Sequence, residues 1–556
     1  MKKIVSLVLA TALMATAFTG CGKGSSLSSN GVTSGTASTA ASSGTTSGKT
    51  LSVCQGPEPE SIDPTLNQSV DGTTNIQHMW EGLTKYTPNG YVNAEAKSID
   101  KSADGKTYTI KLRDDLKWSD GKAVTAQDYV YSWQRCVDPK TASPYNYIFD
   151  PVVNATDIYT GKNKDITSLG VKALDDKTLE VKLVAPCVYF NELLSFCAYY
   201  PERKDIISGN DKWTQDPKTY ITNGPYKLQA WNHKESLVLV KNPYYYDKDK
   251  ITWDSIKFVL LEDDTAILAA YQSGEIDFAY PMAVDEIPAW KDKADFHNDP
   301  ESGNYYFEFN VNKAPFNNAK VRQALSLAVD RNYIVSKVTK ANQMPAAGFV
   351  PTTIKDADTS KTFRSVGGDF YSAKADDYEK NVAQAKQLLS EAGYPNGKGF
   401  PTFEYSTNPS STNTAVAQAL QNMWKTGLGI NCTIATPEWA TFIDNRNKGN
   451  FQVARGAWNA DYDDPMTFLN LFVTGGGNND PKYSNKAYDA LIQKAMATDD
   501  NNVRMPAFHQ AETMLMKDMP VAPLYYATRV YLRNPKLKGY YMSPLGFDYF
   551  MYSTED

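Results

Sequence analysis

Hydrophobic and polar residues alternate with a period of two in several short stretches of the chain, a pattern typical of half-buried strands. Two of these stretches, 171–176 and 178–183, flank Asp175-Asp176-Lys177 and are therefore predicted to form a hairpin. Beyond these two, strands are expected at 51–54, 106–112, 276–279 and 305–311, and in the paired segments GPYKLQAW and ESLVLVKNP that follow Asn223.

Other stretches carry apolar residues three and four positions apart, which is the spacing of an amphipathic helix. Thr125 and Asp128 form an approximate capping box at the start of one of them, and Gly274 and Gly393 end two others. Helices are expected at 76–83, 126–136, 265–273, 318–329, 381–391, 414–426, 488–497 and 506–517. Because helices and strands alternate, the fold class is α/β or α+β.

The beginning of the chain differs from the rest in composition. Lys2 and Lys3 precede an apolar run, 4–18, that is too short to span a membrane, so 1–21 is predicted to be a signal peptide. The small residues before Cys21 resemble a lipoprotein lipobox, although Phe18 stands where leucine is usual. The alternative is an ordinary secreted protein. Residues 22–49 are almost entirely Gly, Ser, Thr and Ala, which predicts a flexible tether.

Composition restricts the function classes. With 556 residues the chain exceeds one hydrophobic core, so two or three domains are expected. Its 42% hydrophobic and 22% charged residues are typical of a soluble globular protein, and a net charge of −6 argues against nucleic acid as a partner.

Residues for catalysis or metal binding are sparse. The 4 histidines lack metal-binding spacing and no Gly-x-Ser-x-Gly motif occurs, so we expect no enzyme, metal or cofactor. If Cys21 is lipidated, the remaining cysteines are odd in number and cannot all pair within the chain. The sequence leaves open whether Cys187 and Cys197 form a disulfide.

The stretch 454–470, ARGAWNADYDDPMTFLN, combines charged and aromatic residues at high density. Arg455, Trp458, Asp461 and Tyr462 fall within a few positions of one another, a combination typical of binding sites and interfaces. We interpret it as a site for the charged backbone end of a peptide. Within it, Asp464 followed by proline is a favourable helix start. A calcium site on the three aspartates is disfavoured, because no loop with the required ligand spacing surrounds them.

From residue 51 to the C-terminus the chain resembles the oligopeptide-binding proteins of ABC importers, a family of extracellular solute-binding proteins that includes dipeptide- and nickel-binding members. Each motif alone is weak, but they occur in the order of that family. The motifs are LRDDLKWSDG at 112–121, TAQDYVYSW at 125–133, TASPY at 141–145, TNGPYKL at 222–228, SGEID at 273–277, APF at 314–316, VRQAL at 321–325, Asp330-Arg331, EAGYP at 391–395, and the stretch 454–470.

This resemblance implies a two-lobed α/β fold of the class II periplasmic-binding-protein type, with hinge closure around the ligand. Lobe I would comprise 50–80, 205–302 and 529–556, the inserted subdomain 81–204, and lobe II 303–528. The implied protein is a monomeric receptor. It is lipid-anchored at the outer face of a cell membrane or on the periplasmic side, and delivers oligopeptides to the permease subunits of an ABC transporter.

The resemblance also assigns roles to residues. In the family, the aspartate of Trp-x-Ala-Asp-Tyr holds the α-ammonium of the peptide, and this residue is Asp461 here. Arg455 matches an arginine that binds the carboxylate of short peptides, and its planar fork suits that task. From the residues alone two alternatives remain open: Asp461 caps a turn beside Tyr462, and Arg455 forms an ion pair with an aspartate of its own stretch.

Further residues match family positions that contact the peptide. Side-chain pocket positions are matched by Trp439, Arg446, Trp458 and Glu308, and for both tryptophans the alternative is core packing. Tyr145 matches a tyrosine that touches the peptide main chain, and Gln68, Ser69 and Val70 match a strand whose backbone pairs with it. Ala457 and Asn459 complete the predicted set.

Several positions depart from the family pattern. The lysine and histidine that bind carboxylates of longer peptides align with Thr339 and Asn413, with Lys340 next to the first. Asn447 and Asn459 replace a histidine and a cysteine. Peptide length and side-chain preference therefore stay open, and if Arg455 is the only carboxylate partner, dipeptides or tripeptides are favoured. The alternative functions are another cargo, such as a metal chelate or an oligosaccharide, and a peptide-sensing role.

Overall fold

The computed structural model describes residues 48–341 and 343–556. The predicted signal peptide, the lipidation site Cys21 and almost all of the predicted tether lie outside these residues. Within them, no helix combines the length and the apolar character needed to cross a membrane.

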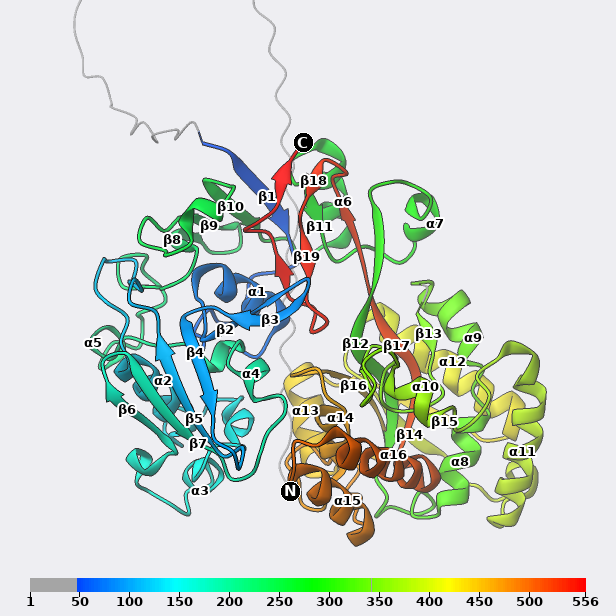
Figure 1. Cartoon of the computed structure of the whole chain (residues 1–556). Helices are drawn as coiled ribbons and strands as arrows, with labels where there is room; N and C mark the ends of the chain where they lie inside the picture. The colour runs from blue at the N-terminus through cyan, green and yellow to red at the C-terminus, as the bar shows by residue number, and fades with distance from the viewer. Residues whose placement is uncertain (1–47, 342) are drawn as a thin grey trace, which may run out of the picture. The chain divides into compact units, whose positions relative to one another are not determined.

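One mixed sheet of eleven strands runs through the described part of the chain (Figure 1). Its order is β15-β14-β16-β12-β17-β11-β1-β10-β9-β8, with β13 also pairing with β17. The strands are β1 (Thr50–Cys54), β8 (Tyr226–Asn232), β9 (Ser236–Lys241), β10 (Ser255–Val259), β11 (Phe278–Ala279), β12 (Phe296–Phe309), β13 (Met344–Pro345), β14 (Phe403–Ser406), β15 (Cys432–Ala435), β16 (Val453–Asn459) and β17 (Val521–Arg533).

Two long strands connect the two ends of this sheet. β12 and β17 pair antiparallel along most of their length, with a register shift between Pro300 and Asn304. The lobe boundaries expected at 302/303 and 528/529 fall inside these strands. The backbone therefore passes twice between the predicted lobes, once in β12 and once in β17. A hinge in such a fold is expected at these two crossings.

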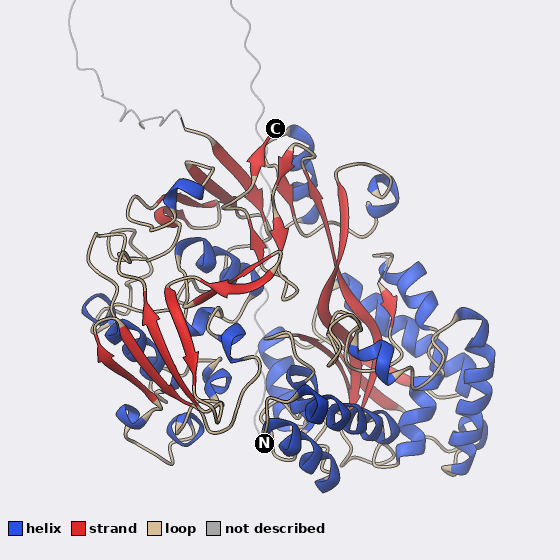
Figure 2. Cartoon of the chain, in the orientation of Figure 1, coloured by secondary structure: helices blue, strands red, loops and turns tan. Residues whose placement is uncertain are grey.

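Helices surround the β14–β17 end of the sheet (Figure 2). Most of them share one hydrophobic core with β12, β14 and β17, and its largest fully buried side chain is Trp424, whereas Phe442 of α13 belongs to a small separate cluster with Phe451 and Ala454. These helices are α8 (Ala319–Leu327), α9 (Arg331–Tyr333), α10 (Phe363–Gly367), α11 (Tyr378–Glu391), α12 (Ser411–Leu428), α13 (Trp439–Lys448), α14 (Met466–Leu469), α15 (Lys486–Met496) and α16 (Asn501–Asp518).

Most of the predicted insert is built around a second sheet of four strands, β4-β5-β7-β6. Its strands are β4 (Ala96–Lys101), β5 (Thr107–Leu112), β6 (Val171–Asp175) and β7 (Thr178–Lys182), and the helices are α2 (Ala126–Val137), α3 (Ala155–Tyr159) and α4 (Phe190–Leu193). The next helix, α5 (Lys204–Ile207), starts at the predicted boundary with lobe I. The predicted β6–β7 hairpin and the Thr125/Asp128 capping box of α2 are both present. A larger hydrophobic core joins this insert to the β1, β8, β9 and β10 part of the large sheet.

The remaining elements are short. They are α1 (Val70–Met79), β2 (Thr84–Thr87), β3 (Gly90–Asn93), α6 (Asp264–Ser273), α7 (Ile287–Trp290), β18 (Leu537–Lys538), β19 (Tyr541–Met542), β20 (Asp548–Tyr549) and β21 (Thr554–Glu555). Gly274 adopts the left-handed conformation (φ +78°) at the end of α6, as its position predicted.

Two expectations at the start of the body are wrong. The helix expected at 76–83 occupies Val70–Met79, because Ser69 caps it by accepting the Gly72 N–H at 3.2 Å. The strand expected at 68–70 is absent for the same reason: Ser69 is the cap of α1 and Val70 is its first residue. The backbone N–H and C=O groups at 68–70 therefore belong to the start of a helix, and not to a strand edge with which a peptide could pair.

Candidate functional site

Asp461 is a buried carboxylate without a cationic partner among the described residues. The Tyr147 hydroxyl donates to its Oδ2 at 3.0 Å, and Oδ1 accepts no hydrogen bond from the described chain. Burial raises the pKa of Asp461 to about 7, and the hydrogen bond from Tyr147 offsets only part of that rise. Its side chain accepts no backbone N–H here, so the turn-capping alternative is wrong. The carboxylate is left with capacity for a cation.

The next two residues contact the insert. The Tyr462 ring stacks on that of Tyr189 with centroids 4.0 Å apart and 7° between the planes. The Asp463 N–H donates to Glu192 Oε2 at 2.9 Å. Together with Tyr147, these contacts tie three consecutive residues after β16 to the insert. Tyr147, Tyr189 and Glu192 were not among the predicted site residues, and the only signal for any of them is that Tyr147 lies close to the TASPY motif.

Asp464 has a structural role. Its Oδ1 accepts the Met466 N–H at 2.9 Å, so a helix starts where the Asp-Pro pair predicted one, although Pro465 and not Asp464 is the residue at the cap of α14. In addition, both of its oxygens accept hydrogen bonds from the Arg504 guanidinium, each at 2.8 Å. Both side chains are buried, so their charges compensate each other. No group of three or more potential metal ligands exists in the described residues, which leaves the aspartates without a metal-site geometry.

Arg455 lies on β16, whose pairing with β12 places it opposite Phe307. It forms no ion pair with any described residue, so the internal ion-pair alternative is wrong. Its guanidinium lies 5.1 Å from the centre of the Tyr305 ring, and its buried Nε has no hydrogen-bond partner. The Tyr405 hydroxyl is also buried without a partner. Unsatisfied donors beside an uncompensated cation suit an anionic ligand group.

Arg446 and Glu308, predicted as pocket residues, form an ion pair. Arg446 Nε donates to Glu308 Oε1 at 2.7 Å, and Arg446 Nη2 lies 2.9 Å from Asp480 Oδ2. All three are largely buried. Burial raises the pKa of Glu308 to about 7 although the Arg446 charge opposes that rise. Two carboxylates thus share one guanidinium.

The other predicted residues lie on different elements of the structure. Ala457 and Asn459 share a face of β16 with Arg455, since they alternate along the strand. Trp458 faces the other way, and its Nε1 donates to Thr467 Oγ1 at 3.2 Å. Tyr145 stands at the start of a short helix, Asn146–Phe149, 5.8 Å from the Tyr147 ring. Gln68 is exposed beside α1, and Trp439 begins α13, but the placement of its side chain lies outside what the structure describes.

No cation replaces the missing lysine and histidine in the described structure. Thr339 donates to Gln343 Oε1 at 2.6 Å, and Asn413 accepts from the Tyr305 hydroxyl at 3.1 Å. Lys340 has a left-handed backbone (φ +54°) and pairs with Asp285 at 2.9 Å. Among these positions Arg455 is therefore the cation that has no ion pair with a described residue.

A cavity of about 840 Å³ opens next to Asp461. Its walls come from the insert, including Tyr147 and Tyr189, from Trp458 at the end of β16, and from the α14–α16 region, including Arg504. Small-molecule sites usually combine such a volume with a mostly apolar wall and a few polar groups.

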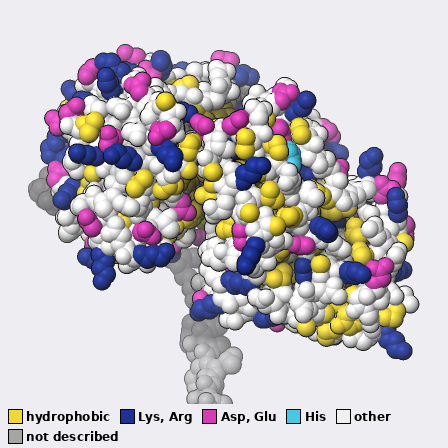
Figure 3. Space-filling model, turned by 60° about the horizontal axis from the view of Figure 1, so that its bottom comes forward, with side chains coloured by type: hydrophobic (Ala, Val, Ile, Leu, Met, Phe, Trp, Pro, Cys, Tyr) yellow, Lys and Arg dark blue, Asp and Glu magenta, His cyan; other side chains and the backbone are white. Residues whose placement is uncertain are grey.

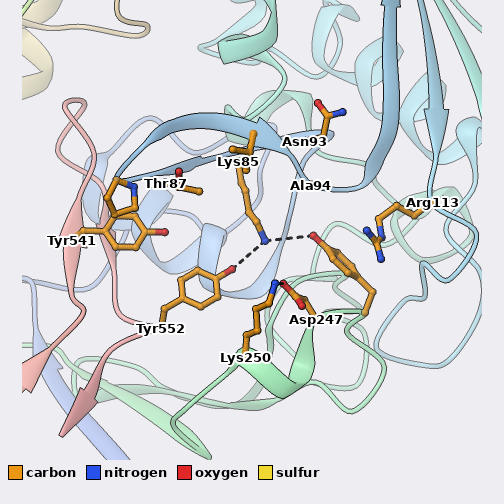
Figure 4. A pocket seen from close by; sticks show the side chains of 12 residues that line it. Lys85, Thr87, Asn93, Ala94, Arg113, Asp247, Lys250, Tyr541 and Tyr552 are labelled. Carbon is orange, nitrogen blue, oxygen red and sulfur yellow. Dashed lines mark hydrogen bonds and ion pairs between the residues drawn. The ribbon is translucent and has the colours of Figure 1, made fainter. Parts of the chain in front are cut away.

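A second, more open pocket of about 610 Å³ lies between the start of the insert and the C-terminal segment (Figure 4). The Lys85 ammonium at its centre contacts the hydroxyls of Tyr552 and Tyr246 at 3.2 and 3.4 Å and pairs with Glu81 at 3.0 Å. Arg113 and Lys250 pair with Asp115 and Asp247 in the same way. Because each cation already has a carboxylate partner, this pocket offers no uncompensated charge.

The face in Figure 3 carries Lys and Arg interspersed with Asp and Glu, so it forms no continuous basic footprint for nucleic acid. The five described cysteines, Cys54, Cys136, Cys187, Cys197 and Cys432, are all free and buried. The pairing that the sequence left open between Cys187 and Cys197 is therefore absent.

A buried carboxylate without a counter-charge beside a cavity, and an arginine without an ion pair on the strand that precedes it, are the features of a protein that binds a solute. Residues 90–480 match the family described as bacterial extracellular solute-binding proteins, family 5 Middle, and the chain belongs to this family. Binding, and not catalysis, is the activity of such proteins.

Curated relatives resemble the chain over nearly its whole length. It is 35% identical to the oligopeptide-binding protein OppA of Bacillus subtilis (strain 168), over 99% of each chain. It is 37% identical to the periplasmic oligopeptide-binding protein OppA of Salmonella typhimurium, over 88% of this chain and 90% of the relative.

Solved structures agree on the fold. The Escherichia coli murein tripeptide binding protein MppA superposes with a TM-score of 0.80 at 33% identity, covering 92% of this chain and 99% of that one. Haemophilus influenzae OppA in complex with RPPGFSPFR gives 0.79 at 31% identity, with the same coverage. The fold is thus the two-lobed class II periplasmic-binding-protein type with an extra subdomain, as the sequence predicted.

Proposed function

We propose that this protein captures oligopeptides between its lobes and delivers them to an ABC permease for import, while a lipid on Cys21 anchors it at the outer face of the cell membrane. The names of the relatives support peptides as the cargo. The observation that carries the proposal is Asp461, a buried carboxylate with no cationic partner in the described structure. Such a group is costly to keep ionised unless a cation pairs with it.

The α-ammonium of a peptide is a cation that every unmodified peptide has. A receptor that accepts many sequences must hold the features all peptides share, and the ammonium and the terminal carboxylate are the charged ones. Asp461 suits the first, and Arg455, which has no ion pair in the described structure and a buried Nε without a hydrogen-bond partner, suits the second. With Thr339 and Asn413 uncharged, carboxylate binding rests on Arg455, which favours short peptides.

The other cargoes have less support from the described residues. An oligosaccharide has no ammonium to compensate Asp461. A metal ion would find no cluster of three or more ligating side chains in 48–341 and 343–556.

Peptides are expected to co-purify with the protein when it is isolated without denaturation, because binding proteins of this class close around their ligand. Native purification, acid release and mass spectrometry of the small-molecule fraction identify the cargo and its length together. We expect peptides of two to a few residues with free termini. A fraction dominated by sugars or metal chelates would overturn the proposal.

Replacing Cys21 by serine is expected to move the protein from the membrane fraction to the medium or periplasm of a bacterial host that lipidates such signals. Two acyl chains at about 0.8 kcal/mol per buried methylene hold a soluble body at a bilayer, and serine cannot accept the thioether-linked lipid. Fractionation and immunoblotting measure the change. Equal membrane retention of C21S and the natural protein would exclude the anchor.

A further inference from the structure

The cavity beside Asp461 has a largely apolar wall that peptide-backbone recognition does not use. The insert contributes Val184, Val188 and Leu193, and the α14–α16 region contributes Leu471, Ile492 and Met496. Val184, Val188 and Met496 are among the exposed large hydrophobic side chains of the described chain. Exposed apolar residues that gather at a cavity, instead of being scattered singly, mark a binding surface.

The charged groups of this cavity are predominantly acidic. Asp150, Asp461 and Asp489 line it, and none of them forms an ion pair with a described residue. Asp150 accepts the hydroxyls of Thr156 and Tyr159, and Asp489 accepts the Thr474 N–H at 2.9 Å. The one arginine in the wall, Arg504, is bound through both terminal nitrogens to Asp464. A cation entering the cavity would therefore meet uncompensated negative charge.

Asp461 differs from the other two aspartates in its burial. Asp150 and Asp489 are only half-buried, and each accepts its hydrogen bonds on Oδ1 from groups that fix local structure. Asp461 receives a single hydroxyl on Oδ2, and its Oδ1 accepts nothing from the described residues. It is also nine-tenths buried, so water screens it poorly.

We propose that this cavity is a binding site for a small organic cation with an apolar substituent, whose ammonium pairs with Asp461 while the apolar part lies between the insert and α15. An apolar cavity of about 150 Å³ is enough to hold benzene. The cavity here, at about 840 Å³, accommodates a phenylalkyl or branched alkyl chain with room for water.

This site goes beyond peptide binding but shares one group with it. A single carboxylate neutralises a single ammonium, so the organic amine and the peptide N-terminus compete for Asp461. Hydrophobic amines would thus lower the affinity of the protein for peptides. The shape of the apolar wall determines which amines bind. Neutral molecules of the same shape bind more weakly, because they leave the buried carboxylate without a cation.

The test uses the full chain freed of bound ligand, and compares 4-phenylbutylamine with 4-phenylbutanol, two molecules of the same shape of which only the amine is charged. Isothermal titration is expected to show amine binding about 30-fold or more tighter than alcohol binding, the loss that follows when one partner of a desolvated charge pair is removed. Asp461→Asn is expected to abolish the difference between the two. In a peptide titration, the amine is expected to raise the apparent Kd for the peptide in proportion to its concentration.

Filling the cavity separates this site from the peptide site. Gly477 lines the cavity, and a Cβ placed on it meets no atom within 4 Å, so Gly477→Trp adds an indole without a backbone clash. We expect G477W to weaken the amine at least tenfold while peptide affinity is retained. Val184→Trp, at an exposed position of the opposite wall, provides a second variant if the first fails to fold.

Each outcome decides one of the two proposals. Equal affinity for amine and alcohol, or amine binding that survives both G477W and V184W, overturns the cavity site and leaves peptide binding untouched. Amine binding that depends on Asp461 and Gly477 in a protein that binds no peptide supports the cavity and overturns the proposed function instead.

Discussion

A peptide with a free N-terminus is expected to bind this protein on the order of 10²–10³-fold more tightly than the same peptide acetylated at its α-nitrogen. Acetylation removes the positive charge, and Asp461 then stays buried without a partner. Leaving one member of a buried ion pair alone costs about 3–5 kcal/mol, and about 1.4 kcal/mol corresponds to a factor of ten in affinity. Calorimetric titration of ligand-free protein with a tripeptide and its N-acetyl form measures the ratio.

Two aspartates of the same loop provide a matched comparison. Asp461→Asn removes the charge that faces the ammonium, and we expect it to bring the free and acetylated peptides to similar, weak affinities. Asp463→Asn changes a carboxylate two residues away. The hydrogen bond of Asp463 to Glu192 comes from its backbone N–H, so the substitution leaves that bond in place. It is expected to preserve the ratio. Loss of the ratio in both variants would mean that the net charge of the loop is responsible, and not Asp461.

The pH dependence of binding gives an independent measure of the same contact. Burial raises the pKa of Asp461 to about 7 in the ligand-free protein, so a proton competes with the peptide ammonium below that pH. Peptide affinity is therefore expected to fall by up to about tenfold per pH unit as the pH drops below 7. In Asp461→Asn this dependence should be absent, and its persistence would assign the titration to another group.

Local signals in the sequence predicted local structure well. The capping box of α2, the β6–β7 hairpin and the glycine that ends α6 each depend on residues a few positions apart, and all three form as expected. β16 and β17 were missed, because their pairing with β12 is decided by contacts across more than a hundred residues. The N-terminus of α1 was missed because its polar, glycine-containing first turn has no hydrophobic periodicity, and only the Ser69 cap marks it.

The site divides in the same way. The motif around Asp461 identified the carboxylate, but its partner Tyr147 lies 314 residues away in the sequence, and no local pattern links the two. The lack of an ion pair at Arg455 and the ion pair between Asp464 and Arg504 likewise depend on tertiary structure. The sequence shows which charged residues are candidates for a site, whereas the tertiary structure determines which of their charges have no partner there.

Replacing Arg446 by methionine is expected to destabilise the folded protein by about 3–5 kcal/mol, the largest loss of stability we expect from a single substitution. Methionine fills much of the volume but leaves two buried carboxylates, Glu308 and Asp480, without their shared cation. Denaturant unfolding of the variant and the natural protein measures the difference. Lys448→Met is the control, because Lys448 is on the same helix, α13, but pairs with Asp444 at the surface, where such pairs contribute about 0–1 kcal/mol.

The deficit of the Arg446 variant should depend on pH in a defined direction. Even beside Arg446, the pKa of Glu308 is raised to about 7, and removal of the guanidinium raises it further. A carboxyl group whose pKa is higher in the folded than in the unfolded state favours folding at low pH, and that advantage is lost as the pH rises through the folded-state pKa. The destabilisation should therefore be smaller at pH 5 than at pH 8, and adding Glu308→Gln should recover part of it. A pH-independent deficit, or an equal loss in Lys448→Met, would show that helix α13 itself, and not the buried charge cluster, determines the stability.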